Sequence, residues 1–378
     1  MGKFKFFSVI LFLCCEKDIK KGQSLEKYSS YEEAGFDSEK IHQLSKFIEE
    51  KSNTTGLYVL HKGKEFFQYG DINDISYIAS CRKSILAILM GKYVENKTIN
   101  LEMTLDELQI DDVEGLLDIE KRAKIDHLAT SRSGVFHVAS NGGYDEKNIL
   151  PRGSKEPGSY YVYNNWDFNA LGFIFEKLVK NSIYNELEDQ IAQPLGFQNW
   201  DLKLQKRSGD PKKSKYLAYH MHLSTQDMAK VGQLMLNNGK WNGKQLFPKN
   251  WINKIITPVT SKDTVMSRTD NSKKLVPDFG YSYMWWTFDS FRENEIYEGS
   301  YSARGFGGQY ITIIPKLELV IAHKTNLKKS PRPQTRDRAS GPINSPATMD
   351  VGSTVASIER AVDARRHFFL SNLATLSM

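Results

Sequence analysis

Two side chains at the start of an apolar stretch have the types and spacing needed for covalent catalysis. Ser80 and Lys83 form an S-x-x-K motif where the strongest predicted helix begins. Residues three apart on a helix lie on one face, with about 5–6 Å between their Cβ atoms. A serine hydroxyl is a weak nucleophile until a base takes its proton, and a desolvated lysine amine can be that base. The pair therefore indicates a nucleophile with its proton acceptor.

The motif by itself is weak evidence, because chance predicts about three S-x-x-K matches in a chain of this composition. A second match runs from Ser24 to Lys27 in a polar stretch near the N-terminus. The alternative for Ser80 is that its hydroxyl caps the helix while Lys83 is solvated.

The Y-x-N sequence at Tyr163 and Asn165 occurs once in the chain and precedes another apolar helix. A tyrosine relays protons when a nearby cation lowers its pKa, and Lys83 would be such a cation. Asn165 could hydrogen-bond Lys83 and a substrate amide at once. The alternative is an aromatic loop that only packs beneath the helix.

A glycine cluster, Gly305, Gly307 and Gly308, leads into a predicted strand. Glycines let another backbone or a ligand approach closely. A strand edge beside Ser80 would supply the second N–H of an oxyanion hole, the first being that of Ser80. The alternative is a tight turn with a bulge.

Hydrophobic periodicity predicts the elements that must position these side chains. We expect helices over residues 37–51, 80–93, 169–180 and 224–238, and strands over residues 56–61, 65–69, 281–287, 310–314 and 319–323. This order implies one sheet assembled from both ends of the chain, with a mostly helical segment, residues 100–223, inserted between its halves.

These motifs, in this order, resemble the serine β-lactamase and penicillin-binding-protein superfamily. The resemblance covers about residues 30–327 and includes the segment D-H-L-A-T-S-R-S-G at residues 126–134. It is greatest for the branch of class C β-lactamases, D-alanyl-D-alanine carboxypeptidases, related esterases and 6-aminohexanoate-dimer hydrolases. The resemblance implies an α/β, β-lactamase-like fold: a mainly antiparallel sheet flanked by helices, with an inserted all-helical subdomain.

The resemblance also implies roles for the motif residues. Ser80 would be the acylated nucleophile, Lys83 its partner and Tyr163 the proton-transfer residue, with Asn165 beside them to bind substrate. No metal or organic cofactor is needed for this chemistry.

The family's third motif is usually Lys-Thr-Gly or His-x-Gly, and its best match here is Ala303-Arg304-Gly305. The family's cation or imidazole is therefore missing from the first position, which weakens a specific claim to β-lactam hydrolysis. Arg304 need not substitute, because successive strand residues face opposite ways. Gly305 and Phe306 would line the substrate site, and the Phe306 N–H would be the second oxyanion donor.

We therefore expect an exported serine hydrolase that acts on a small-molecule ester, amide or lactam through an acyl-enzyme on Ser80. The alternatives are a peptidoglycan D,D-peptidase or true β-lactamase, and a catalytically silent surface binding protein of the same fold. His220 and His222 have a spacing that suits a metal, but no third ligand joins them, so no metal is expected.

Composition and the chain ends complete the prediction. Of 378 residues 40% are hydrophobic and 25% charged, which excludes wholesale disorder and a multi-span membrane protein. A net charge of +6 over this length indicates no nucleic-acid partner. Residues 1–22, with Lys3 and Lys5 before an apolar run, are expected to be a signal peptide and linker. Lipidation of Cys15, giving membrane attachment and a periplasmic or cell-envelope location, is favoured over an ordinary cleaved signal.

Residues 23–327 are expected to form the hydrolase domain. Residues 328–378 differ in composition, with six Arg and no Lys from Ser330 onward, and are treated as an atypical tail.

Overall fold

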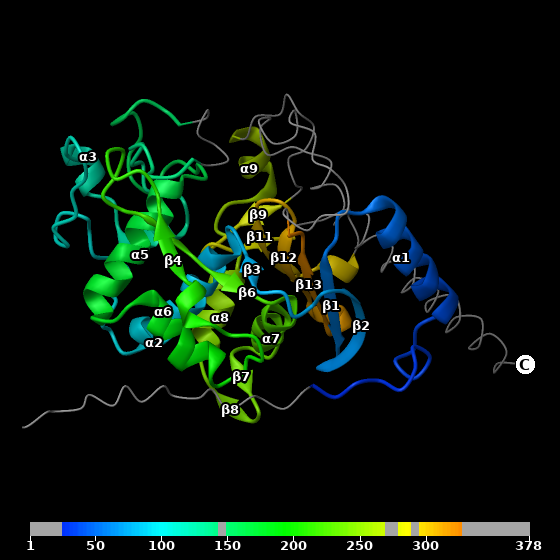
Figure 1. Cartoon of the computed structure of the whole chain (residues 1–378). Coiled ribbons are helices and arrows are strands. Elements are labelled where there is room, and N and C mark those ends of the chain that lie inside the picture. The colour runs from blue at the N-terminus through cyan, green and yellow to red at the C-terminus, as the bar shows by residue number, and fades with distance from the viewer. Residues whose placement is uncertain (1–24, 143–148, 269–278, 289–294, 327–378) are drawn as a thin grey trace, which may run out of the picture.

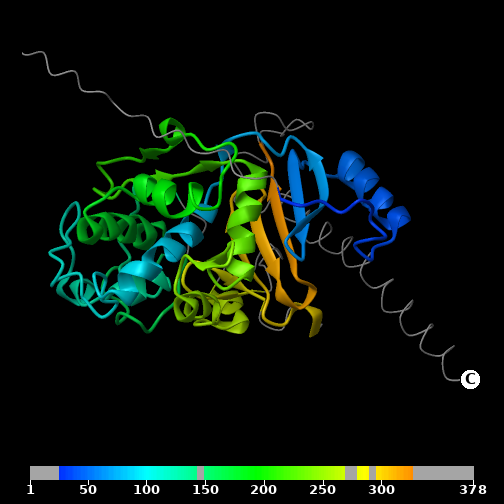
Figure 2. The ribbon, with the colours of Figure 1, turned by 90° about the horizontal axis from the view of Figure 1, so that it is seen from below.

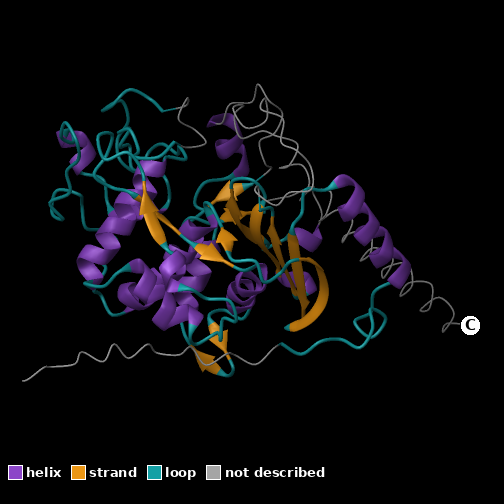
Figure 3. Cartoon of the chain, in the orientation of Figure 1, coloured by secondary structure: helices purple, strands orange, loops and turns teal. Residues whose placement is uncertain are grey.

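A seven-stranded sheet forms the centre of the molecule in this computed structural model, which describes residues 25–142, 149–268, 279–288 and 295–326. The strand order is β2-β1-β13-β12-β11-β10-β9, and every neighbouring pair is antiparallel. The strands are β1 (Gly56–His61), β2 (Lys64–Gly70), β9 (Gly280–Tyr281), β10 (Trp286–Thr287), β11 (Tyr301–Gly305), β12 (Gln309–Ile314) and β13 (Leu319–Lys324). β1 pairs with β13, so the sheet joins both ends of the described chain, as the sequence predicts (Figure 1). The strands of the sheet are drawn in orange in Figure 3.

Both faces of this sheet are buried, which explains why its central strands are apolar throughout rather than alternating. In β13, Val320 and Ala322 belong to a large core cluster on one face, while Leu319 and Ile321 belong to a smaller cluster on the other. The smaller cluster is covered by α1 (Ser38–Lys51), and the larger one contains α2 (Cys81–Glu95) and α7 (Thr225–Leu236).

The remaining helices are gathered on the α2 side of the sheet, away from α1 (Figures 1 and 2). They are α3 (Asp118–Lys121), α4 (Ile125–Ala129), α5 (Asn165–Val179), α6 (Ile183–Leu187), α8 (Lys249–Ile256) and α9 (Lys262–Arg268). Three two-stranded pairs accompany them: β3 (Ser76–Tyr77) with β6 (His222–Leu223), β4 (Lys206–Ser208) with β5 (Ala218–His220), and β7 (Lys240–Trp241) with β8 (Lys244–Gln245). This is the predicted α/β architecture with a mainly helical insertion.

The helix starts follow side-chain capping. Ser224 Oγ accepts the Asp227 N–H at 3.1 Å, which confirms the predicted start of α7. The prediction that the helix after the Y-x-N sequence begins at Asn169 is wrong by four residues. Asn164 Oδ1 accepts the Trp166 N–H at 3.0 Å, so α5 begins at Asn165.

The single strand predicted over residues 281–287 is also wrong. The chain turns back on itself at Met284, whose φ is +60°, and forms two short antiparallel strands in which Trp286 pairs with Tyr281. Period-2 patterning does not distinguish one strand from two that are folded over a tight turn. Strand β11 was not predicted. The glycine cluster therefore lies at the end of β11 and in the turn before β12 rather than at the start of one strand.

The two chain ends, including Cys15 and residues 328–378, lie outside the described residues. Within the ranges that the structure describes, no helix has the length and apolar character that crossing a bilayer would require.

Candidate active site

The turn that carries Ser80 is an unusual piece of backbone. Ala79 has φ of +50° and is buried, a conformation that costs free energy for any residue other than glycine. Ser80 follows at the N-cap position of α2, is half-buried, and its side chain makes no capping hydrogen bond. The structure therefore does not support a capping role for this hydroxyl, and it leaves the side chain at the positive end of the helix dipole.

Lys83 is the centre of the site's hydrogen bonding. Its side chain is buried, and Nζ donates to Tyr163 Oη at 2.6 Å and to Asn165 Oδ1 at 2.7 Å. The Lys83 N–H donates to the Ser80 carbonyl at 3.0 Å, so both residues leave the same turn of α2. The alternative of a solvated Lys83 is wrong, and the structure brings the amine, the phenol and the amide into direct contact.

The surroundings of Lys83 disfavour its charged form. Burial lowers the pKa of the Lys83 amine well below its ordinary value, and the positive charge of Arg82 lowers it further. The buried Asp167 acts in the opposite direction. The rings of Tyr163 and Phe168, each with its centroid 4.2 Å from Nζ, complete the enclosure.

Aromatic packing fixes the orientation of the Tyr163 ring. Trp286 stacks on it with centroids 5.6 Å apart and planes 25° apart, and Tyr281 meets it edge-on at 5.9 Å. Phe168, in α5, also packs against the Tyr163 ring, with centroids 5.0 Å apart. A ring held by several aromatic contacts keeps its hydroxyl in one place, which a proton-transfer residue requires.

The segment at residues 126–134 holds the Tyr163 loop through its backbone. Ser131 Oγ donates to the Val162 carbonyl at 2.8 Å, and the Val162 N–H returns a bond to the Ser131 carbonyl at 3.1 Å. The Gly158 N–H donates to the Arg132 carbonyl at 2.7 Å. These three hydrogen bonds hold the Tyr163 loop against the segment at residues 126–134.

Asp167 was not identified from the sequence, although it lies in the first turn of α5 close to Lys83. It is buried, and Ser133 Oγ donates to its Oδ1 at 2.6 Å. Burial raises the pKa of the Asp167 carboxyl well above its ordinary value, opposed in part by the Ser133 hydrogen bond. The signal that could have found it is a carboxyl group in the first turn of a helix whose first half otherwise carries no charge.

Gly305 brings the end of β11 against the turn before Ser80. A Cβ at this position would lie 2.6 Å from the Ile78 carbonyl oxygen and 3.0 Å from the Ala79 Cβ. The close backbone approach predicted for the glycine cluster is therefore present. Phe306 follows directly and is 49% exposed, so this corner lies at the surface beside the turn that carries Ser80. Their roles in oxyanion and substrate binding stay predictions.

The third motif supplies no cation on the Ser80 side of the sheet. Ala303 packs into the core cluster that contains α2. The Arg304 guanidinium carbon lies 4.6 Å from the Phe279 ring centroid and 4.4 Å from that of Tyr310, both in the cluster on the α1 face. Arg304 therefore points away from Ser80, as strand alternation implies.

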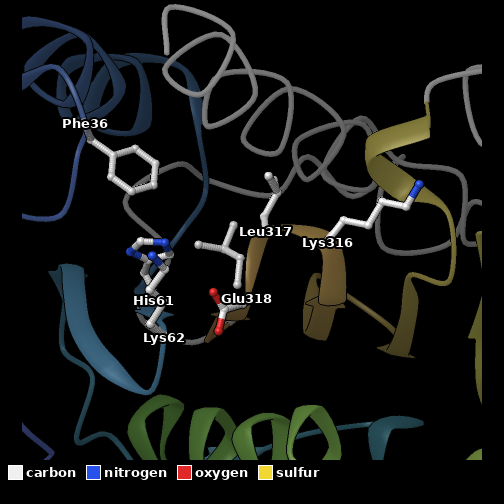
Figure 4. Close-up of a pocket in the computed structure, with 7 residues that line it drawn as sticks. Phe36, His61, Lys62, Lys316, Leu317 and Glu318 are labelled. Atoms are coloured by element: carbon white, nitrogen blue, oxygen red, sulfur yellow. The ribbon is translucent and has the colours of Figure 1, made fainter. Parts of the chain in front are cut away.

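Other candidate sites contribute nothing to this constellation. Among the described residues no three His, Cys, Asp or Glu side chains are grouped so that they could hold a metal, and His220 Nε2 instead lies 2.6 Å from Ser208 Oγ. A pocket of about 230 Å³ lies on the α1 face, where the Phe36 and His61 rings meet edge-on with centroids 5.2 Å apart (Figure 4).

Comparison with known families agrees with this geometry. The family model described as Beta-lactamase matches residues 45–341, which span the Ser80 turn, the Y-x-N loop and strand β11. The chain belongs to the beta-lactamase family. The predicted superfamily and fold class are thereby confirmed.

Several other proteins and solved structures are similar to the chain. It is 25% identical over 275 residues to an uncharacterized protein of Alkalihalophilus pseudofirmus, covering 68% of this chain and 74% of that one. A structure from Bacillus anthracis, provisionally named a 6-aminohexanoate-dimer hydrolase, has a TM-score of 0.56 and 21% identity, covering 82% and 81% of the two chains. EstCE1, a hydrolase with promiscuous acyltransferase activity, has a TM-score of 0.55 and 14% identity, covering 83% and 98%.

Proposed function

We propose that this member of the beta-lactamase family is a serine hydrolase that cleaves ester or amide bonds through a covalent acyl-enzyme on Ser80. One observation carries the proposal. The buried Lys83 amine donates to Tyr163 and Asn165 from the same helical turn that presents the uncapped Ser80 hydroxyl.

The hydrogen-bond inventory supports a neutral amine as the base. An ammonium has three N–H groups, whereas a neutral amine has two and one lone pair. Tyr163 Oη and Asn165 Oδ1 accept two N–H groups of Lys83. In the neutral form both donors are thus used, and the lone pair is left for the Ser80 proton.

Acylation then follows a balanced sequence of bond changes. Ser80 Oγ bonds to the substrate carbonyl carbon as its proton passes to Lys83, and the carbonyl oxygen becomes an oxyanion. The Ser80 and Phe306 N–H groups would stabilise that charge. Collapse breaks the bond to the leaving group, which takes a proton through Tyr163. Water then bonds to the ester carbon as its proton passes to Lys83, and the bond from that carbon to Ser80 Oγ breaks. Ser80 Oγ takes the proton back from Lys83, and the carboxylic acid leaves.

The charge distribution favours substrates without a carboxylate next to the scissile bond. β-Lactams and D-alanyl-D-alanine peptides carry such a carboxylate, which is best recognised by a cation. The third motif places the methyl group of Ala303 on the Ser80 side, while Arg304 lies over two rings on the opposite face. Uncharged esters and amides therefore fit this site better than lactams or peptidoglycan peptides.

Covalent labelling tests the proposal. A fluorophosphonate probe should modify Ser80, identified by mass spectrometry of the digested protein, and Ser80→Ala should abolish the adduct. Ser24→Ala, which removes the serine of the other S-x-x-K match, is the matched control and should label normally. Undiminished labelling of Ser80→Ala would refute the assignment, and no adduct on the wild-type protein would indicate a silent binding protein.

A substrate panel separates the enzyme classes. We expect hydrolysis of p-nitrophenyl esters to exceed that of a chromogenic cephalosporin. The reverse order would identify a β-lactamase, and release of D-alanine from a peptidoglycan peptide would identify a D,D-peptidase.

We also propose that the protein is exported and anchored to the membrane by a lipid on Cys15. The support is the basic start, the apolar run and the cysteine that closes it.

A further inference from the structure

Arg82 is a buried cation beside the site that the proposed chemistry does not use. It precedes Lys83 in α2 and is 2% exposed. Its Nη2 donates to Asn169 Oδ1 at 3.1 Å, and its guanidinium carbon lies 4.3 Å from the centroid of the Tyr219 ring. A buried arginine is normally paired with a carboxylate. Among the described residues no carboxylate forms an ion pair with Arg82, and an amide oxygen and an aromatic ring hold its charge in place.

Burial disfavours the charged forms of the acidic groups around Lys83. Burial raises the pKa of the Asp167 carboxyl, of the Cys81 thiol and of the Tyr281 phenol, which favours the protonated form of each. An arginine stays protonated in proteins. The groups that face Lys83 from α2, the Y-x-N loop, α5 and β9 are Arg82, Cys81, Tyr163, Asp167 and Tyr281. Arg82 is therefore the permanent charge in this set.

We propose that Arg82 is a positioning residue that acts on Lys83 through its fixed positive charge, keeping the Lys83 amine neutral and able to accept the Ser80 proton. Arg82 donates to Asn169, and Lys83 donates to Asn165 one turn earlier on the same face of α5, so the two cationic groups are held near each other. A second positive charge there is penalised, because a protein interior screens charges less than water does. The Asn169 amide and the Tyr219 ring hold the guanidinium without cancelling its charge. This inference rests on the proposed function, in which Lys83 is the base.

Two variants test the charge of Arg82 in different ways. Arg82→Gln removes it. Asn169→Asp keeps the arginine but places a carboxylate at the atom that already accepts its hydrogen bond, so the charge is neutralised in place. Lys92→Gln is the matched control, because it removes one positive charge from the last turn of the same helix.

Two readouts are measured against pH. The first is the 13Cε chemical shift of Lys83 in lysine-labelled protein, assigned by the loss of its resonance in Lys83→Met. The second is the rate of fluorophosphonate labelling of Ser80. We expect both Arg82→Gln and Asn169→Asp to move the Lys83 titration midpoint to higher pH. The loss of a nearby like charge should raise the Lys83 midpoint by about one pH unit. Labelling should therefore be about tenfold slower than wild type on the acid limb and equal to wild type on the alkaline plateau.

The outcomes separate this inference from the proposed function. An unchanged Lys83 midpoint in folded Arg82→Gln would overturn it, as would an equal shift in Lys92→Gln. If Arg82→Gln does not fold, the midpoint in Arg82→Met, which keeps a long side chain without the charge, decides. If wild-type Ser80 does not label at all, the proposed function fails, and the chemical-shift titration still decides whether Arg82 acts on Lys83.

Discussion

Tyr163→Phe removes one hydroxyl from the site and leaves the ring that carries it in place. The ring keeps its contacts with Trp286, Tyr281 and Phe168, while Lys83 Nζ loses the acceptor at 2.6 Å. The lost buried hydrogen bond costs about 1–3 kcal/mol of stability, which a domain stable by about 5–15 kcal/mol tolerates.

The kinetic effect should be larger. Loss of a positioned proton-transfer group lowers rates by about 10²–10⁴-fold. At 1.36 kcal/mol for each factor of ten, this corresponds to about 2.7–5.4 kcal/mol of transition-state free energy. If Tyr163 protonates the leaving group, the loss of rate should be greater for a more basic leaving group.

The assay compares an anilide with a p-nitrophenyl ester of the same acyl group. The anilide nitrogen must be protonated to leave, whereas p-nitrophenolate leaves as an anion. We expect kcat/KM for the anilide to fall at least about tenfold more than for the ester. Tyr161→Phe is the matched control, since it removes a hydroxyl from a buried ring of the same loop. It should change kcat/KM for neither the anilide nor the ester.

Equal losses with the two substrates would refute proton delivery by Tyr163. Unchanged rates with both would remove Tyr163 from the mechanism altogether.

Three further perturbations test the site and the chain ends. Burial raises the pKa of the Asp167 carboxyl in the folded protein above its ordinary value of 3.8. Between these two pKa values the folded protein keeps a proton that the unfolded chain releases, so the free energy of unfolding falls as the pH rises through this range. Asp167→Asn should therefore unfold at higher urea than wild type at about pH 7 but not at about pH 4, and a lower midpoint at about pH 7 would contradict this. Gly305→Ala places a methyl group 2.6 Å from the Ile78 carbonyl oxygen. We expect the free energy of unfolding, measured in urea, to fall by about 1–3 kcal/mol and the labelling of Ser80 to slow. Wild-type values for both would show that the turn accommodates the methyl group without strain. Cys15→Ser should abolish incorporation of radiolabelled palmitate and release the protein from the membrane fraction, whereas persistent lipid label would show that another residue is modified.

The sequence carried enough information for the fold class and the main elements. The central strands are apolar because both faces of the sheet are buried, and that pattern is local. Caps such as Ser224 at α7 depend on residues a few positions apart, and they too were predictable. Errors arose where local pattern is ambiguous, as at Met284, where a turn with positive φ divides one predicted strand into two.

The motif residues were also identifiable, because each carries a reactive group at a spacing that is meaningful within one element. Ser80 with Lys83 on one helical turn is such a case. The supporting residues were not. Asp167 and Arg82 matter only through burial and through the charges around them, neither of which can be obtained from residue types alone.

The sequence by itself therefore determined which groups are present: a hydroxyl, an amine, a phenol and a glycine corner, on elements of predictable type. Only the tertiary structure decided that Lys83 reaches Tyr163 across 80 positions of the chain, that Ser80 does not cap its helix, and that Arg304 turns away from the site. The physical reason is that reactivity depends on distance and desolvation, and both are set by how the α2 turn, the Y-x-N loop and the end of β11 pack together.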